Sequence, residues 1–245
     1  MVSSAEKKAR IQEFFRFSQQ EVIGLVAAVL VTTFIFSFRD WGGVSFDLIT
    51  GLRNFFLVLL ATMITFLIRL SSQKILGLED GYLAEFKVWF AGLGIALAVA
   101  FISKGLVPLV LIGTMVNRFM VKQRLGELRY GFAYSQNAGI ANRGVIVNLG
   151  LATFFSAILI FYPSSYFLSK IVLLNLVMAL CSMLPLPRLE GLGMFFGGRA
   201  VYYALIIGTI LYWVLLLTRT KIGLVIAAII LVIVVTLNNI KGSEK

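Results

Sequence analysis

Long apolar runs separated by short polar stretches dominate the pattern of this chain. The runs lie near residues 22–38, 54–70, 87–103, 144–162, 170–184, 200–217 and 222–238. Most approach the roughly 20 residues that an α-helix needs to cross a hydrocarbon core. The apolar stretch 105–116 contains Pro108 and is short for a span, so it is either a re-entrant arm or a steep short helix. The pattern predicts an all-α polytopic membrane protein with about six to eight transmembrane helices.

The N-terminal segment, residues 1–21, has a different composition. Its basic residues alternate with Ile11, Phe14 and Phe15, which is typical of a short amphipathic helix on a membrane surface. No small-residue cleavage site follows the first apolar run, which favours a retained anchor. Because neither a repeat nor a low-complexity linker divides the rest of the chain, we interpret residues 22–240 as a single transmembrane domain.

One segment departs from the helical period. Within residues 128–134 bulky side chains, among them Tyr130 and Phe132, occupy every second position. This alternation predicts a small β-hairpin near residues 118–134. An isolated hairpin is marginally stable in water, so we expect it to pack against the helices.

Composition supports the membrane class. Hydrophobic residues make up 60% of the chain and charged residues 13%, about half the charged fraction of a soluble domain. The net charge of +11 comes from basic residues dispersed between apolar runs. Because basic residues commonly gather at the ends of spans, this charge does not require a nucleic-acid partner, and we expect none.

The basic residues also predict an orientation. If the N-terminus is cytoplasmic and residues 87–118 enter and return as a hairpin, six of the 22 Lys and Arg residues lie on the far side and sixteen on the cytoplasmic side. The six are Arg39, Arg53, Lys104, Lys170, Arg219 and Lys221. Since basic residues favour cytoplasmic loops, we expect a multi-pass protein of the cell membrane with both termini in the cytoplasm.

The chain contains no histidine. This absence excludes Ser-His-Asp triads, histidine general bases and every zinc site that uses imidazole. Cys181 is the single cysteine, so no intrachain disulfide can form.

Residues 181–191 read Cys-Ser-Met-Leu-Pro-Leu-Pro-Arg-Leu-Glu-Gly. This segment resembles the (N)xxPxPxLDG motif of the site-2 protease family of intramembrane zinc metalloproteases, particularly its archaeal branch. The retained positions are Pro185, Pro187, Leu189 and Gly191. Glu190 stands in place of the zinc-binding aspartate, and Ser182 in place of an asparagine.

Three further segments are similar to the family, in the same order along the chain. Residues 81–86, Gly-Tyr-Leu-Ala-Glu-Phe, resemble the stretch that follows HExxH in archaeal members. Gly144 and Asn148 match a GPxxN pattern that opens a later span, with Val145 in place of the proline. Residues 17–21 resemble the entry to the first span. The resemblance implies a site-2-protease-like core over most of the chain.

The resemblance places the HExxH motif on residues 69–73, which read Arg-Leu-Ser-Ser-Gln. In working members the histidines and the aspartate bind zinc, and the glutamate activates the attacking water. Here Arg69 and Gln73 occupy the histidine positions and Leu70 that of the glutamate. A guanidinium cannot ligate a cation and leucine cannot accept a proton, so we expect no zinc, no other cofactor and no catalytic residue.

Two arrangements of the replaced positions stay open. Arg69 and Gln73 are one helical turn apart and share a face of their helix. If the family fold persists, this face points at Glu190, and an ion pair joins the two spans where zinc lies in working members. Alternatively, Arg69 extends to the cytoplasmic interface and Glu190 is hydrated in a loop. Arg69 would also repel any dication held by the remaining candidate ligands, which are Glu85, Glu190 and Cys181.

The resemblance further implies a cleft for an unwound membrane segment. We assign to it Asn148, Ser182, Pro185, Pro187, Tyr130 and Phe132. The two prolines favour an extended, non-helical segment whether or not a substrate binds there. Asn148 and Asn175 lie within apolar runs, where a hydrogen bond across helices is a structural alternative to ligand contact.

Our leading hypothesis is a pseudoprotease that binds or chaperones segments of other membrane proteins, with the hairpin adding a strand to an unwound client. One alternative is an intramembrane metalloprotease with an atypical site. A second is a small-solute transporter or channel, although no inverted repeat supports it. The expected partners are the lipid bilayer and transmembrane segments of other proteins.

Overall fold

The computed structural model describes residues 4–42, 45–119 and 134–243. Within them, the elements are α1 (Ser4–Phe14), α2 (Gln19–Ser37), α3 (Leu48–Glu79), β1 (Tyr82–Val88), α4 (Phe90–Ile102), β2 (Gly113–Phe119), α5 (Tyr134–Phe161), α6 (Tyr166–Ser182), α7 (Glu190–Gly197), α8 (Arg199–Leu217) and α9 (Lys221–Ser243). Each of the seven long apolar runs forms a helix over most of its length, as predicted, although the run at 87–103 begins in β1.

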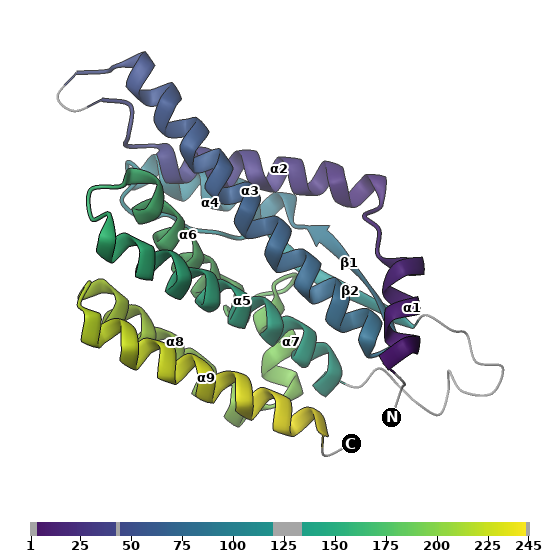
Figure 1. Ribbon diagram of the computed structural model, residues 1–245. Coiled ribbons are helices and arrows are strands. Elements are labelled where there is room, and N and C mark those ends of the chain that lie inside the picture. Colours follow the sequence, from purple (N-terminus) through teal and green to yellow (C-terminus); the bar gives the residue numbers. More distant parts are fainter. Residues whose placement is uncertain (1–3, 43–44, 120–133, 244–245) are drawn as a thin grey trace.

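Helices α3, α5 and α6 form the centre of a helical bundle (Figure 1). Helix α2 and strand β1 pack on α3, whereas α7 and α9 pack on α5. Two hydrophobic clusters result. One joins α2, α3, α4, α6 and both strands, with Phe66 and Met178 fully buried, and the other joins α5 to α9 around Tyr212. The bundle therefore has a protein-facing interior on both sides of the α3–α5 contact.

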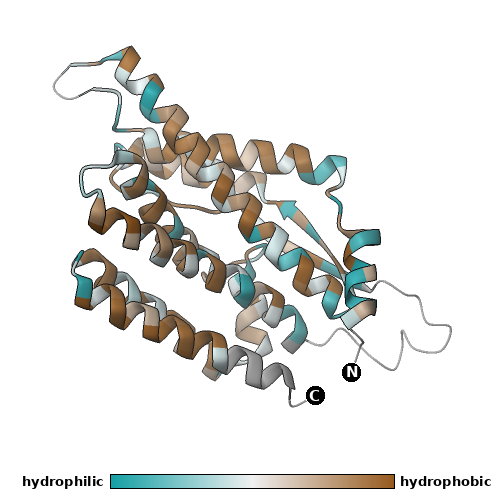
Figure 2. Ribbon diagram, in the orientation of Figure 1, coloured by the Kyte–Doolittle hydropathy of each residue, from teal (hydrophilic) through white to brown (hydrophobic). Residues whose placement is uncertain are grey.

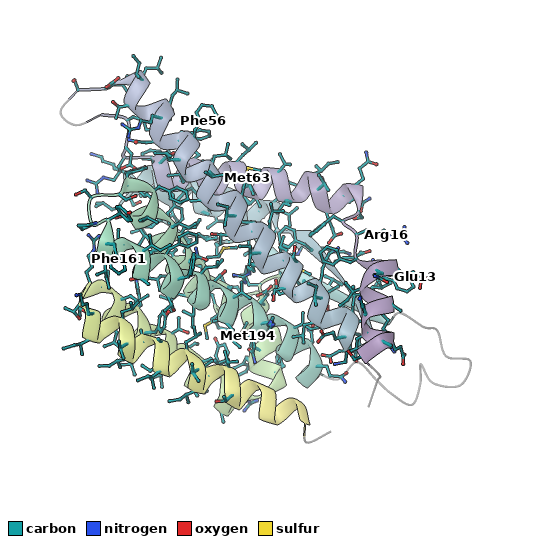
Figure 3. All side chains as sticks on the ribbon, viewed as in Figure 1. Glu13, Arg16, Phe56, Met63, Phe161 and Met194 are labelled. Carbon is teal, nitrogen blue, oxygen red and sulfur yellow. The ribbon has the colours of Figure 1, made fainter. Side chains whose placement is uncertain are left out.

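Within the described ranges, four helices are long and apolar enough to cross a membrane: Gln19–Ser37, Leu48–Glu79, Gln136–Phe161 and Arg199–Leu217. Three shorter apolar helices are Phe90–Ile102, Tyr166–Ser182 and Lys221–Thr236. Hydrophobic residues extend along the helices (Figure 2). Phe56 and Phe161, labelled in Figure 3, are 61% and 79% exposed, as suits a lipid-facing surface. The chain is a membrane protein, and a total of about six to eight spans stays a prediction.

The sheet differs from the expected hairpin. Strand β1 pairs with β2 in antiparallel register, from Tyr82 opposite Phe119 to Val88 opposite Gly113. Of the predicted hairpin near 118–134, residues 120–133, with Tyr130 and Phe132, lie outside the described residues. The β1 strand was not predicted, although Tyr82, Ala84 and Phe86 alternate as its buried side chains. Its polar residues and the apolar run from residue 87 obscured this period.

Residues 87–118 form the predicted hairpin-like segment, in which α4 leads away from β1 and the chain then comes back as β2, antiparallel to β1. Helix α4 ends in a turn where Lys104 and Gly105 have φ of 51° and 73°. Residues 105–112 contain no helix and β2 follows, so the alternative of a short helix at 105–116 is wrong. The N–H of Trp89 donates to the carbonyl of Ile112 at 2.8 Å, which holds the returning chain beside β1. Extended backbone is satisfied here because it pairs with protein instead of facing lipid.

A buried polar network fastens α2, α3 and β1 together. Ser18 caps α2, and the Glu21 carboxylate accepts from the Ser18 N–H at 2.8 Å. The same carboxylate accepts from the N–H of Phe86 at 2.7 Å and from Lys74 Nζ at 2.9 Å. Lys74 also donates to the carbonyl of Arg16 at 2.6 Å. The segment 1–21 is thus split between α1 and the first turn of α2, and its division from residues 22–240 stays a prediction.

Candidate functional site

The Arg-Leu-Ser-Ser-Gln segment lies inside α3, which continues to Glu79, and not at the end of a span as its apolar run suggested. Arg69 and Gln73 project from the same face into the protein, where they are 1% and 0% exposed. Leu70, at the position of the family's glutamate, is buried beside them. The interior of the bundle, and not an interface, is therefore the environment of these side chains.

The proline-containing segment forms a turn between α6 and α7. Pro185 and Pro187 are exposed and non-helical as predicted, but the segment folds as a turn, with the Leu189 N–H donating to the Leu186 carbonyl at 3.1 Å, and not as an extended strand. Ser182 is buried at the end of α6, where its hydroxyl donates to the Ala179 carbonyl at 2.9 Å. The turn delivers Glu190 as the first residue of α7, with only 4% of its surface exposed.

Glu190 meets the α3 face directly. Its Oε2 accepts from Arg69 Nη2 at 2.7 Å, and its Oε1 accepts from Gln73 Nε2 at 2.8 Å. Gln73 Nε2 also donates to the carbonyl of Ile140 at 3.2 Å. Of the two open arrangements, the buried ion pair is confirmed. Both carboxylate oxygens are bound, so a guanidinium and an amide occupy the place that the resemblance assigns to zinc ligands.

Helix α5 closes the cluster from the other side. A Cβ on Gly144 would lie 2.5 Å from Gln73 Nε2 and 3.1 Å from Arg69 Nε, so α5 approaches as closely as glycine permits. Asn148, one turn further, is fully buried, and its amide has no hydrogen-bond partner in the described part of the chain. Asn175 donates to Thr65 Oγ1 at 3.0 Å, which confirms a hydrogen bond across helices for that residue.

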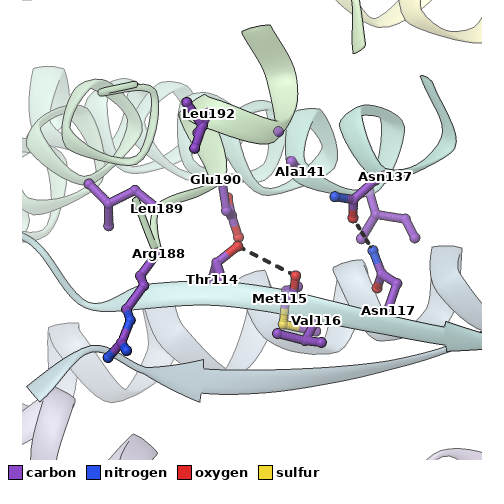
Figure 4. Close-up of a pocket in the computed structure, with 12 residues that line it drawn as sticks. Thr114, Met115, Val116, Asn117, Asn137, Ala141, Arg188, Leu189, Glu190 and Leu192 are labelled. Atoms are coloured by element: carbon purple, nitrogen blue, oxygen red, sulfur yellow. Dashed lines mark hydrogen bonds between the residues drawn. The ribbon is translucent and has the colours of Figure 1, made fainter. Parts of the chain in front are cut away.

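A pocket of about 270 Å³ adjoins Glu190 (Figure 4). It is lined by Thr114, Met115, Val116, Asn117, Asn137, Ile140, Ala141, Arg188, Leu189, Glu190, Leu192 and Gly193. Among the predicted cleft residues, Asn148, Ser182, Pro185 and Pro187 are not part of this lining. The lining residues Thr114, Asn117 and Asn137 were missed, because single polar residues beside a short apolar stretch carry no pattern of their own.

The residues at this cluster do not fit zinc. Glu190 is the one carboxylate, and its oxygens are bound by Arg69 and Gln73. Zinc sites need several anionic or imidazole ligands, whereas Arg69 brings a permanent positive charge. In the ranges that the structure describes, no three Asp, Glu, Cys or His side chains gather at one place.

A relative extends over most of the chain. The Methanocaldococcus jannaschii protein named "Putative zinc metalloprotease MJ0611" is 30% identical over 183 residues, which cover 72% of this chain and 84% of the relative. The chain belongs to the site-2-protease-like family. No family model and no solved structure matches this site-2-protease-like chain.

In this site-2-protease-like chain, we expect Gly191→Ala, at the start of α7, to lower the free energy of unfolding. A Cβ at Gly191 would lie 2.2 Å from the carbonyl oxygen of Met183 and 2.4 Å from that of Leu184. Since backbone must move to relieve this overlap, we expect the variant to lose about 1–3 kcal/mol of unfolding free energy. Gly150→Ala is the matched control, because nothing lies within 4 Å of its Cβ. Unfolding in mixed detergent micelles measures both, and equal stability of the two variants would contradict this packing.

Proposed function

We propose that this chain is a non-catalytic site-2-protease-like protein that binds segments of other membrane proteins. The observation that carries the proposal is the Arg69–Glu190–Gln73 cluster. It replaces zinc ligands by a guanidinium and an amide, and Leu70 offers no general base to activate water. These residues therefore supply neither the metal ligands nor the base that the family's chemistry uses.

Strand β2 supports the client-binding part of the proposal. It pairs with β1 on one edge, and the described residues supply no strand on the other. Met115 of β2 lies opposite Phe86 of β1. The N–H of Phe86 points away from β2 and donates to Glu21, so this is a non-hydrogen-bonded pair. In an antiparallel pair such positions direct their backbone groups outward, so Met115 and Asn117 direct theirs to the open edge beside the pocket. The Thr114 hydroxyl donates to the Met115 carbonyl at 3.4 Å, a long hydrogen bond that a client N–H would have to replace.

An extended client segment can add to such an edge, because backbone pairing needs no chemistry and tolerates many side chains. Strand β2 thereby takes the role first assigned to a hairpin near 118–134. The same proposal includes an orientation with both termini in the cytoplasm. The placement of α1 and the C-terminal end of α9 at one end of the bundle supports it (Figure 1).

Metal analysis tests the non-catalytic part. We expect no stoichiometric zinc in the purified protein and no chelator-sensitive cleavage of membrane substrates. The matched variant is Arg69→His with Leu70→Glu, Gln73→His and Glu190→Asp, which rebuilds the family's ligand set and should acquire zinc. Stoichiometric zinc in the unmodified chain, together with cleavage that a chelator stops, would overturn the proposal.

Those results would favour the second candidate, an intramembrane metalloprotease with an atypical site. The printed name of the Methanocaldococcus jannaschii relative is the observation in its favour. The composition of the cluster weighs against it, because Arg69 repels a dication.

Photocrosslinking tests the client-binding part. A photoreactive residue in place of Val116, on the pocket side of β2, should capture membrane proteins in the native membrane. Ile229 on α9, 54% exposed, is a matched lipid-facing control position. Recovery at position 116 no greater than at position 229 would contradict binding at this edge.

A further inference from the structure

Arg188 is the lining residue whose charge the described structure leaves uncompensated. It is exposed, lies in the turn before Glu190 and forms no ion pair with the described residues. In Figure 4 it occupies one end of the pocket, whereas Asn117 and Asn137 occupy the other. Because an unpaired guanidinium beside an open strand edge favours anions, the charge of this pocket depends on Arg188.

Of the other charged residues nearby, Glu190 and Arg118 are paired, whereas Lys87, opposite Thr114 on β1, is an exposed cation outside the lining. Glu190 is the one acidic lining residue, and Arg69 neutralises it at 2.7 Å. Arg118, on β2, lies outside the lining and pairs with Glu85 at 3.7 Å. Among the described residues that line the pocket, one positive charge is therefore left unpaired, that of Arg188, and the other polar lining groups are amides and a hydroxyl.

The backbone of Arg188 is also informative. Its φ of 68° lies in the left-handed region, where a non-glycine residue other than Asn or Asp is uncommon. The turn would tolerate Gly or Asn at this position with less strain, so the turn itself does not require arginine. The arginine side chain is therefore not explained by the backbone conformation of the turn.

We propose that Arg188 selects an extended client segment that carries a carboxylate side chain, bound along the open edge of β2. This inference rests on the proposed client binding and names the class of client. Met115, Asn117 and Arg188 line the same pocket, with Arg188 toward one end, so a segment paired with Met115 and Asn117 extends toward Arg188. A Glu or Asp there would accept charge-assisted hydrogen bonds from the guanidinium. Lysine at the same place would be repelled.

Three labelled heptapeptides test this selection by fluorescence anisotropy with the full chain in dodecyl maltoside. They are Thr-Val-Thr-X-Thr-Val-Thr with both ends blocked and X as Glu, Gln or Lys. We expect the Glu peptide to bind about three- to tenfold more tightly than the Gln peptide, and the Lys peptide to bind most weakly. Arg188→Asn should remove these differences without disturbing the turn, because Asn accepts a left-handed backbone.

Two control variants sharpen the result. Arg188→Lys keeps the charge and should retain most of the preference, whereas Arg118→Asn removes a charge outside the pocket and should leave the preference unchanged. Equal binding of all three peptides to the unmodified chain, or a Glu preference that survives Arg188→Asn, would overturn the selection and leave client binding standing. Failure of every peptide to bind would instead count against client binding at β2.

Two other occupants of the edge are outcomes of the same test. If peptides bind only after residues 120–133 are replaced by a Gly-Ser linker of equal length, the chain itself covers the edge and the proposal fails. If Arg188→Asn converts a dimer into a monomer in detergent, a second copy occupies the edge, which also overturns selection of a client.

Discussion

Glu190→Ala should lower the free energy of unfolding by about 3–5 kcal/mol, because it leaves Arg69 charged and unpaired in the interior. Arg69 is 1% exposed and Glu190 is its ion-pair partner at 2.7 Å. Arg69→Ala should cost a similar amount for the converse reason. Reversible unfolding in mixed micelles of SDS and dodecyl maltoside measures both losses.

The double variant distinguishes a true pair from two independent sites. Arg69→Ala with Glu190→Ala should cost less than the sum of the single changes, since the second substitution removes the charge that the first left unpaired. Arg69→Met with Glu190→Leu should approach the stability of the unmodified chain, because Arg69 Nε and Nη1 have no hydrogen-bond partner within the described ranges. Simple additivity of the alanine variants would refute the pairing.

A surface pair provides the control for these measurements. Arg118 and Glu85 lie 3.7 Å apart, and their side chains are 60% and 36% exposed. Glu85→Ala should therefore cost no more than about 1 kcal/mol, because exposed pairs are screened by solvent. A loss at Glu85 equal to that at Glu190 would show that burial is not the source of the effect.

Glu21→Ala should have a comparably large effect, about 3–5 kcal/mol, because it removes the acceptor shared by a buried lysine and two backbone N–H groups. Lys74 would keep its bond to the Arg16 carbonyl but lose its charge partner. The N–H of Phe86 would lose its acceptor at 2.7 Å and be left unsatisfied. We therefore expect β1 to loosen together with the start of α2.

Hydrogen–deuterium exchange locates this second effect. The Phe86 amide and its neighbours in β1 should exchange faster in Glu21→Ala than in the unmodified chain. Glu6→Ala is the control, because Glu6 pairs with Arg10 on the exposed side of α1 and should lose about 0.5 kcal/mol or less. Unchanged exchange at the Phe86 amide would contradict the conclusion that the hydrogen bonds of Glu21 hold β1 in place.

The positions of the apolar helices followed from sequence, because hydropathy over a window of roughly 20 residues reports burial in lipid or protein without knowledge of partners. The expected alignment of residues 69–73 with HExxH also came from sequence, since Gly81 and the Pro185–Gly191 segment set the register of the resemblance. Local pattern could not show that α3 extends past Lys74, because the polar residues of its last turns are satisfied by α2 and by other distant segments.

The sequence alone thus determined the membrane class and the helical runs, and it gave the resemblance that aligns residues 69–73 with the family's zinc-binding motif. Only the tertiary structure decided that Arg69 pairs with Glu190, 121 positions away, and does not reach an interface. It also decided that β1 pairs with β2 and that Arg188 stands beside an open edge. The reason is physical: helix formation in a membrane depends on local hydropathy, whereas ion pairs, strand pairing and pockets depend on which distant segments the folded chain brings into contact.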